Sequence, residues 1–310
     1  MDWYEPYKKQ LEAVFTSANG QIAKFPPPLN EIGLEYTLAF NPLVNDDGTD
    51  FICTLLPYWM KEAIDLSDEQ CEKLVLVNIY GMLYFFIQDD VMDDKDNSKR
   101  KLLLALANLF YLNMFNLLQQ LFPTNSTFWN YYERYLTTWA DSVVNEGEHN
   151  FFMSDPILTA GKAGPVKIAS TGALLLIGQA ERIEATETAV DLALTTLQML
   201  DDWTDWQQDM EDGSYNGLLA LIASQMGEGT TFDMVTKAQV ETQIYVYGYL
   251  NRFVEIAERN HAHLLHLQLS ITPLIKYHSD LVESLRGIAL KIDDNKRKLL
   301  GGGLNYMFSK

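Results

Sequence analysis

The chain has 310 residues, of which 47% are hydrophobic, so it can bury a substantial core. Its 42 acidic and 23 basic side chains give a net charge of -19, which argues against binding to nucleic acid or to an anionic membrane, because both need a basic face. The two cysteines lack metal-ligand spacing and the first residues lack a signal-peptide profile, so we expect a cytoplasmic protein.

The first fifty residues combine one helical pattern with two irregular passages. Residues from about Tyr4 to Thr16 have the apolar spacing of an amphipathic helix. Consecutive prolines at 26–28 cannot continue a helix. Turn-forming residues at 41–49 predict a loop.

A capping-box pattern at Ser67 to Gln70 predicts the start of a long helix that runs to about Met92. The longest apolar run of the chain, 74–87, lies inside this helix and is interrupted by Asn78. It is shorter than the roughly 20 residues that a membrane span needs. We therefore expect no stable membrane insertion.

The rest of the chain is also helical in pattern, and no segment shows the sustained alternation of a strand. No linker rich in proline, glycine or serine divides it. We predict an all-α fold of roughly ten helices in a single domain, residues 1–310. The further helices are expected at 101–121, 127–150, 166–182, 186–210, 238–270 and 273–293, and a break in the chain is expected at 161–165.

The first long helix is expected to end in a cluster of aspartates. Asp89 and Asp93 are four positions apart, as are Asp90 and Asp94, so each pair shares one helix face. The helix dipole disfavours anions at a C-terminal end by up to about 1 kcal/mol each. A bound cation would relieve this cost.

A second cluster lies in the helix expected at 186–210. Asp201, Asp205 and Asp209 are four apart and form one acidic ridge, while Asp202 lies about a quarter turn away. Like charges on one ridge repel, and magnesium prefers carboxylate oxygens as ligands. Two such ridges facing each other would hold several magnesium ions, and those ions would hold a diphosphate.

Residues 89–93 and 198–205 resemble the first and second aspartate-rich motifs of the class I isoprenoid synthases. This superfamily holds trans-isoprenyl diphosphate synthases, terpene cyclases and squalene/phytoene synthases. The second match includes Gln198, three positions before the aspartate pair, and Lys167 begins a segment similar to the diphosphate-holding lysine segment of the prenyl synthases. The resemblance spans residues 67–215 and implies a bundle of ten or more helices around a central apolar cavity, and a homodimer.

The resemblance implies that an allylic prenyl diphosphate is ionised with Mg2+, three ions accompanying the bound diphosphate. The implied catalytic residues are Asp89, Asp93, Asp201 and Asp205, and the implied metal ligands are Asp89, Asp90, Asp93, Asp201, Asp205 and Asp209. The implied substrate-binding residues are Lys167, Arg100, Gln198, Tyr84, Phe85, Lys276 and Tyr277. Bulky Tyr84 and Phe85 before the first motif would close the pocket floor, which favours a substrate of 15 or 20 carbons.

Departures from the prenyl-synthase pattern favour one branch of the superfamily. Chain elongation needs a second basic site, much of it from a Gly-Gly-Lys-x-x-Arg segment near the N-terminus, and the first arginine here is Arg100. Lys276-Tyr277 is similar to the C-terminal Arg-Tyr pair of the cyclases. The sequence therefore predicts a terpene synthase that cyclises or quenches a carbocation.

Two alternatives remain open. One is a prenyltransferase: an isoprenyl diphosphate synthase, which joins the allylic group to isopentenyl diphosphate, or an enzyme that uses another acceptor. A head-to-head prenyl synthase also belongs to this alternative, since both ridges contain aspartates with Asp-x-x-x-Asp spacing. The other is a non-catalytic partner subunit, which the intact aspartate clusters disfavour.

Overall fold

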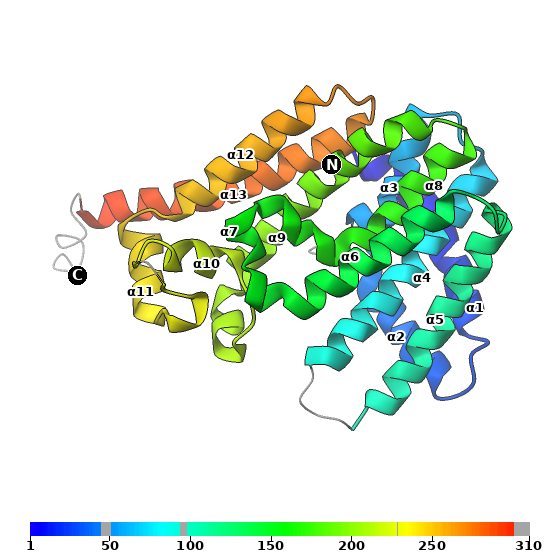
Figure 1. Cartoon of the computed structure of the whole chain (residues 1–310), viewed down its shortest axis with the longest axis horizontal. Coiled ribbons are helices and arrows are strands. Elements are labelled where there is room, and N and C mark those ends of the chain that lie inside the picture. The colour runs from blue at the N-terminus through cyan, green and yellow to red at the C-terminus, as the bar shows by residue number, and fades with distance from the viewer. Residues whose placement is uncertain (45–50, 94–97, 228, 301–310) are drawn as a thin grey trace, which may run out of the picture. The chain divides into compact units, whose positions relative to one another are not determined.

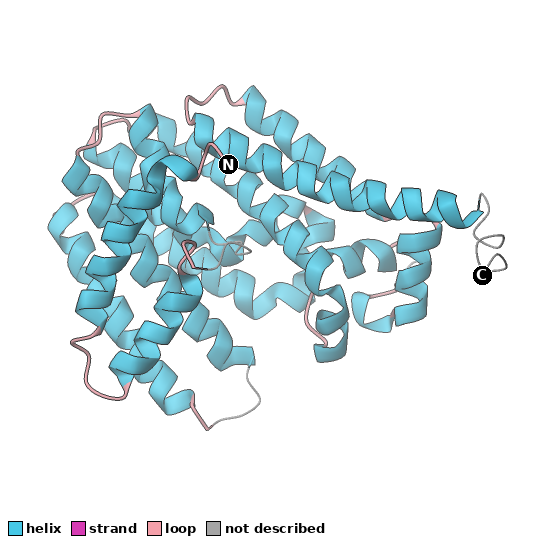
Figure 2. Ribbon diagram, turned by 180° about the vertical axis from the view of Figure 1, so that it is seen from behind, coloured by secondary structure: helices cyan, strands magenta, loops and turns pink. Residues whose placement is uncertain are grey.

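The computed structural model describes residues 1–44, 51–93, 98–227 and 229–300 (Figure 1). Within these ranges every regular element is helical and no strand occurs, which confirms the all-α prediction (Figure 2). The α-helices of this described part are α1 Lys8–Ile22, α2 Leu29–Phe40, α3 Phe51–Ala63, α4 Asp68–Asp93, α5 Arg100–Leu121, α6 Phe128–His149, α7 Phe151–Ser154, α8 Lys167–Leu176, α9 Ile183–Asp212, α10 Gly217–Ala223, α11 Lys237–Glu241, α12 Leu250–His266 and α13 Thr272–Leu300.

Shorter helical segments connect several of these helices. They are the 3-10 segments η1 Glu5–Tyr7, η2 Pro156–Val166, η3 Ala180–Arg182 and η4 Phe232–Met234, and the π-helix η5 Thr242–Val246.

Contacts along the backbone divide the chain into two compact units. Unit 1 comprises Met1–Trp139, Ala163–Thr188 and Leu269–Leu274, and unit 2 comprises Ala140–Lys162, Ala189–Gln268 and Ile275–Lys310. Helices α6, α9 and α13 each contribute residues to both units. The single domain, and the central cavity, stay predictions.

Unit 1 is built around α4, which packs against α3, α5 and α8. Its first turn has the predicted capping box: the Ser67 amide donates to Gln70 Oε1 and the Gln70 amide donates to Ser67 Oγ, each at 3.2 Å. In both views α4 and α5 run side by side (Figures 1 and 2). The capping box therefore sets the start of the helix that carries the first aspartate cluster.

Two helices of unit 1, α4 and α5, are long and apolar enough to cross a membrane by length and composition alone. The apolar window of α4 is 61% buried inside the structure and that of α5 is 33% buried. Core helices of soluble proteins pass the same test, so the absence of membrane insertion stays a prediction.

Three expected segments differ from the structure. The passage at 161–165 is not a break but part of η2. Helix α8 ends at Leu176, before Gly178 in the left-handed region at a φ of 71°, whereas the helix was expected to reach residue 182. The helix expected at 238–270 is divided into α11, η5 and α12. Gly248, which separates η5 from α12, adopts a φ of 69° that α-helical backbone does not allow.

The core of unit 2 is formed by α9, α10, α12 and α13 together with α7. It includes the buried side chains Phe152, Met199, Trp206, Leu218, Leu219, Ile222, Phe253 and Leu285. Helices α12 and α13 also carry a hydrogen-bonded histidine pair. His278 Nδ1 lies 2.9 Å from His261 Nδ1, and His278 Nε2 lies 2.9 Å from Thr196 Oγ1.

The hydrogen bonds around this pair determine which ring nitrogens donate and which accept. Thr196 Oγ1 donates to the Leu192 carbonyl at 3.0 Å and accepts from the Asn260 amide at 3.2 Å, so His278 Nε2 is left to donate to it. His278 Nδ1 is then an acceptor for His261. Burial, and next the neighbouring His261, lower the pKa of His278 to about 3, so the ring is held neutral.

We expect the His278 ring to make the fold sensitive to acid. The unfolded chain binds a proton at this ring below about pH 6.5, whereas the folded chain does not until about pH 3, so the free energy of unfolding falls as the pH is lowered through this window. Between about pH 7.5 and about pH 5, the free energy of unfolding should fall by about 2 kcal/mol more in the wild type than in His278→Gln, as measured by urea unfolding. An equal fall in both proteins would contradict the assignment of His278 as a neutral buried ring.

Candidate functional site

The second aspartate cluster forms the acidic ridge on α9 that the sequence predicts. Asp201 and Asp209 are half-buried and Asp205 is exposed. Burial first, and then the charges of the other ridge aspartates, raise the pKa of Asp201. The pKa of Asp209 is raised by burial and by Asp205. The three carboxylates therefore repel one another as expected, and we call Asp201, Asp205 and Asp209 the α9 ridge.

Asp202 faces away from solvent and does not belong to the α9 ridge. Its side chain is 4% exposed, and its carboxylate accepts from the Gly217 amide at 2.9 Å and from Gln198 Nε2 at 3.0 Å. Burial raises its pKa to about 7, although both hydrogen bonds lower it. Asp202 thus links α9 to the start of α10.

Asn216 completes this link between α9 and α10. Its Oδ1 caps α10 by accepting from the Leu218 and Leu219 amides at 3.0 and 3.1 Å. Its Nδ2 donates to the Asp202 carbonyl at 2.8 Å and to Asp209 Oδ2 at 2.7 Å. One fully buried side chain therefore caps a helix and orients a carboxylate of the α9 ridge.

Gly217 is required at this junction because there is no room for a side chain. A Cβ there would lie 2.8 Å from both Asp202 Oδ2 and Phe152 Cδ2. Tyr215 joins α7 to the same turn, since its hydroxyl donates to Asn150 Oδ1 at 2.8 Å and accepts from the Phe152 amide at 3.0 Å. The turn from 215 to 217 is thus fixed on several sides.

A lysine near the α9 ridge was not found from the sequence. Lys162 pairs with Glu146, with its Nζ 2.9 and 2.8 Å from the two carboxylate oxygens. Its charge lowers the pKa of Asp201 and of Asp209, against the larger effect of burial. Unit 2 therefore places the Lys162 cation near the α9 ridge.

Gln198, which the resemblance implies as a substrate-binding residue, contacts the aspartate pair of α9. Its amide donates to Asp202 Oδ1, and more weakly to Asp201 Oδ2 at 3.4 Å. The side chain therefore orients the aspartate pair. The structure thus brings Gln198, Asp201, Asp205 and Asp209 together in unit 2.

The first aspartate cluster lies at the C-terminal end of α4 in unit 1. Asp89 is half-buried, and exposed Asp90 accepts a hydrogen bond from the Tyr36 hydroxyl. The Arg100 guanidinium lies at the same helix end, with Nη2 3.4 Å from the Val91 carbonyl. The side chain of Asp93 lies outside the described residues.

Lys167 belongs to the same unit as the first cluster. It opens α8, which packs against α4, and its side chain is 8% exposed. Its Nζ lies 5.4 Å from the centre of the Tyr135 ring, within the range of a cation–π contact. Lys167 is therefore a largely buried cation in the unit that carries Asp89.

The bulky residues before the first cluster are packed among aromatics of unit 1. Phe85 is 2% exposed, with its ring centre 4.8 Å from that of Trp139, and Tyr84 lies 5.3 Å from Tyr111. In unit 2, Tyr277 is buried and Lys276 is exposed on α13. Their roles toward a substrate stay predictions.

The carboxylates fit magnesium by donor chemistry, though they do not form a closed ligand cage. Among the described residues, no three histidine, cysteine, aspartate or glutamate side chains converge as a metal-binding group. Magnesium often binds through one or two carboxylates and keeps water or phosphate oxygens as its other ligands. Half-buried like charges such as Asp201 and Asp209 suit an ion held in this open manner.

No family model matches the chain, and a search of curated proteins finds no relative.

We expect Asn216→Ala to destabilise the protein strongly. The substitution removes the α10 cap, worth about 1 kcal/mol, and leaves the Asp202 carbonyl and the Asp209 carboxylate without this donor, at about 1 to 3 kcal/mol. The free energy of unfolding should fall by roughly 2 to 4 kcal/mol in urea unfolding. Exposed Asn108, replaced by alanine, is the matched control and should change stability by less than about 0.5 kcal/mol. A loss in Asn216→Ala no larger than in the control would refute this role.

Proposed function

We propose that the chain is a class I terpene synthase, which ionises an allylic prenyl diphosphate of 15 or 20 carbons with Mg2+ and cyclises or quenches the carbocation. The α9 ridge carries this proposal. Asp201, Asp205 and Asp209 repel one another, yet Asn216 and the buried Asp202 hold the helix that presents them. A fold that retains such repulsion is suited to a cationic ligand.

Bound magnesium would neutralise charge on the leaving diphosphate and so promote ionisation. Asp201 and Asp209 would offer magnesium carboxylate oxygens that are already partly removed from water. Gln198 and Asn216 orient two of these carboxylates by hydrogen bonds. Lys162, and Lys167 in the other unit, are cations suited to diphosphate oxygens.

A carbocation has to be kept from water and stabilised by aromatic faces, each worth about 0.5 to 2 kcal/mol. Tyr84 is half-buried and suits such a lining. Trp206, by contrast, belongs to the apolar core of unit 2, and Tyr80 stacks near Phe110 with ring centres 6.4 Å apart. Trp206 and Tyr80 therefore serve packing.

The alternative function, a prenyltransferase, gains support from Lys162. Chain elongation needs a second group of cations for the second diphosphate, and Lys162 is a cation near the α9 ridge that the sequence did not suggest. It is already paired with Glu146. A single paired lysine is a weaker basic site than elongation requires, so we retain the lyase as the proposed function. The homodimer stays a prediction.

We expect Asp89→Ala and Asp201→Ala each to reduce turnover of farnesyl or geranylgeranyl diphosphate by about 100-fold or more, because each removes a proposed magnesium ligand. Asp201→Ala should leave stability unchanged or slightly raised, since it removes one charge from a repulsive cluster. Released diphosphate measures the turnover, and urea unfolding measures stability.

Glu211→Ala is the matched control, because Glu211 is an exposed carboxylate of α9 two positions from Asp209, off the ridge. It should keep nearly full activity. Full activity in Asp89→Ala or Asp201→Ala would remove that residue from the proposed site.

Lys167→Met should weaken binding of diphosphate while keeping most of the buried packing of the side chain. Losing a charged hydrogen-bond donor is expected to raise the dissociation constant for magnesium diphosphate about tenfold, as measured by calorimetry. The control is Lys9→Met, which replaces an exposed lysine and should bind magnesium diphosphate as tightly as the wild type does. Unchanged affinity in Lys167→Met would leave this lysine a structural role only.

A further inference from the structure

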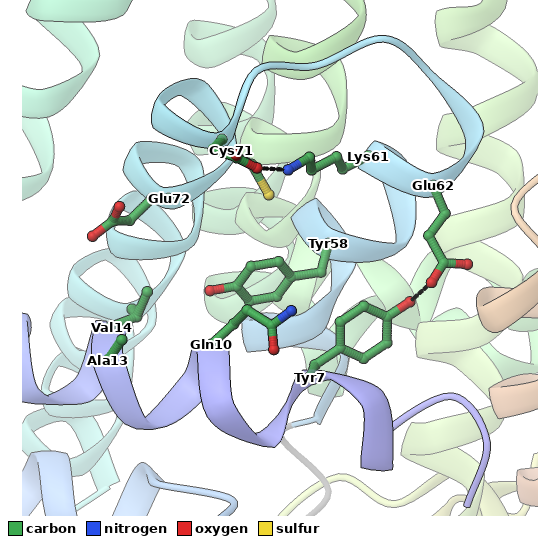
Figure 3. Close-up of a pocket in the computed structure, with 10 residues that line it drawn as sticks. Tyr7, Gln10, Ala13, Val14, Tyr58, Lys61, Glu62, Cys71 and Glu72 are labelled. Carbon is green, nitrogen blue, oxygen red and sulfur yellow. Dashed lines mark hydrogen bonds and ion pairs between the residues drawn. The ribbon is translucent and has the colours of Figure 1, made fainter.

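A pocket of about 440 Å³ lies among η1, α1, α3 and α4 of unit 1 (Figure 3). This volume is within the range of small-molecule sites. Its floor is made of buried side chains, and its rim carries exposed polar ones. None of its lining residues belongs to the aspartate clusters or to the residues proposed to bind diphosphate.

The floor of the pocket is aromatic. The Tyr7 and Tyr58 rings stack with centres 5.7 Å apart and an angle of 22° between their planes. Val14 and the Cys71 thiol complete this surface, and Figure 3 shows the thiol directed toward Tyr58. Burial raises the pKa of Cys71 to about 12 and also raises that of Tyr58, so the floor is uncharged near neutral pH.

The rim has an excess of negative charge. Lys61 forms an ion pair with Asp68, which cancels the cation of the pocket. Glu62 and Glu72 remain as carboxylates, and Glu62 accepts a hydrogen bond from the Tyr7 hydroxyl. The uncompensated charge excludes phosphates and other anions from this pocket and favours a cation.

The Tyr58 hydroxyl lines the pocket and makes no hydrogen bond to the described residues. The side chain is only 8% exposed, and Figure 3 shows its hydroxyl projecting from α3 into the space beside α1 and α4. Its oxygen can accept a hydrogen bond from a donor group of a ligand in the pocket.

We propose that this pocket binds a free, protonated primary alkylamine. Its ammonium group donates a hydrogen bond to the Tyr58 hydroxyl and is attracted by Glu62 and Glu72, while its alkyl chain lies on the Tyr7 and Tyr58 rings. An ammonium supplies the donor, the positive charge and the affinity for aromatic rings that these groups require together.

Calorimetric titration of the full chain with hexylammonium tests the proposal. We expect saturable binding, and affinity that rises about threefold to fourfold for each methylene from butylammonium to hexylammonium, because each buried methylene is removed from water. Hexanol, the neutral analogue, should bind at least tenfold more weakly. Absence of hexylammonium binding, or equal binding of hexanol, would overturn the proposal.

Variants locate the binding at this pocket. Glu62→Gln combined with Glu72→Gln should weaken hexylammonium binding about tenfold, and Tyr58→Phe about fivefold. Glu69→Gln is the matched control, because Glu69 lies on α4 outside the pocket and pairs with Lys73. The affinity of this variant for hexylammonium should stay unchanged. Thermal unfolding of each variant verifies the fold, and Ala13→Leu, which partly fills the pocket, gives a second test should Tyr58→Phe unfold. Binding that is insensitive to all of these changes would refute the assignment.

A lysine side chain of another protein carries the same ammonium chemistry. Titration with an N-acetyl-lysine methylamide separates the two sources. Weaker binding than that of hexylammonium supports a free amine, whereas tighter binding would overturn the small-molecule assignment.

Discussion

The candidate site depends on the hydrogen bonds that the buried Asp202 carboxyl group accepts. This group accepts from the Gly217 amide at 2.9 Å and from Gln198 at 3.0 Å, and both bonds hold α9 against the start of α10. Asn216 strengthens the junction by capping α10 and bonding to Asp209. A carboxyl group buried in this way is costly unless it is hydrogen-bonded, so the junction tolerates little change. The acidic ridge therefore projects from a helix that several hydrogen bonds hold in place.

That constraint explains how like charges persist on α9. Burial and mutual repulsion raise the pKa of Asp201 and Asp209, and Lys162 only partly offsets this. Without a rigid frame, the helix could lower its energy by turning the carboxylates apart into solvent. The frame holds them where a cation could be bound. The pocket of unit 1 separates charges differently, since its carboxylates lie on an exposed rim above an uncharged floor of Tyr7 and Tyr58.

Much of the fold follows from local patterns in the sequence. The capping box at Ser67 predicted the start of α4, and four-residue spacing predicted the face shared by Asp201, Asp205 and Asp209. Contacts between distant residues could not be predicted. Asn216 before Gly217 and an apolar run is a recognisable N-cap signal, but its bond to Asp209 depends on how the chain turns between two helices. Similarly, nothing local connects Lys162 with Asp201 or His278 with Thr196. Lys162 stands in a stretch with two glycines and a proline, whose pattern predicts a break and not part of a site.

The most direct measurement is an incubation of the purified protein with magnesium and farnesyl or geranylgeranyl diphosphate, first alone and then with isopentenyl diphosphate. Hydrocarbons or alcohols and longer diphosphates would be measured in the same samples. The proposed terpene synthase predicts a hydrocarbon or an alcohol from the single allylic substrate. A longer diphosphate that forms only when isopentenyl diphosphate is present would contradict it and establish a prenyltransferase. No product under either condition would contradict both enzymatic functions.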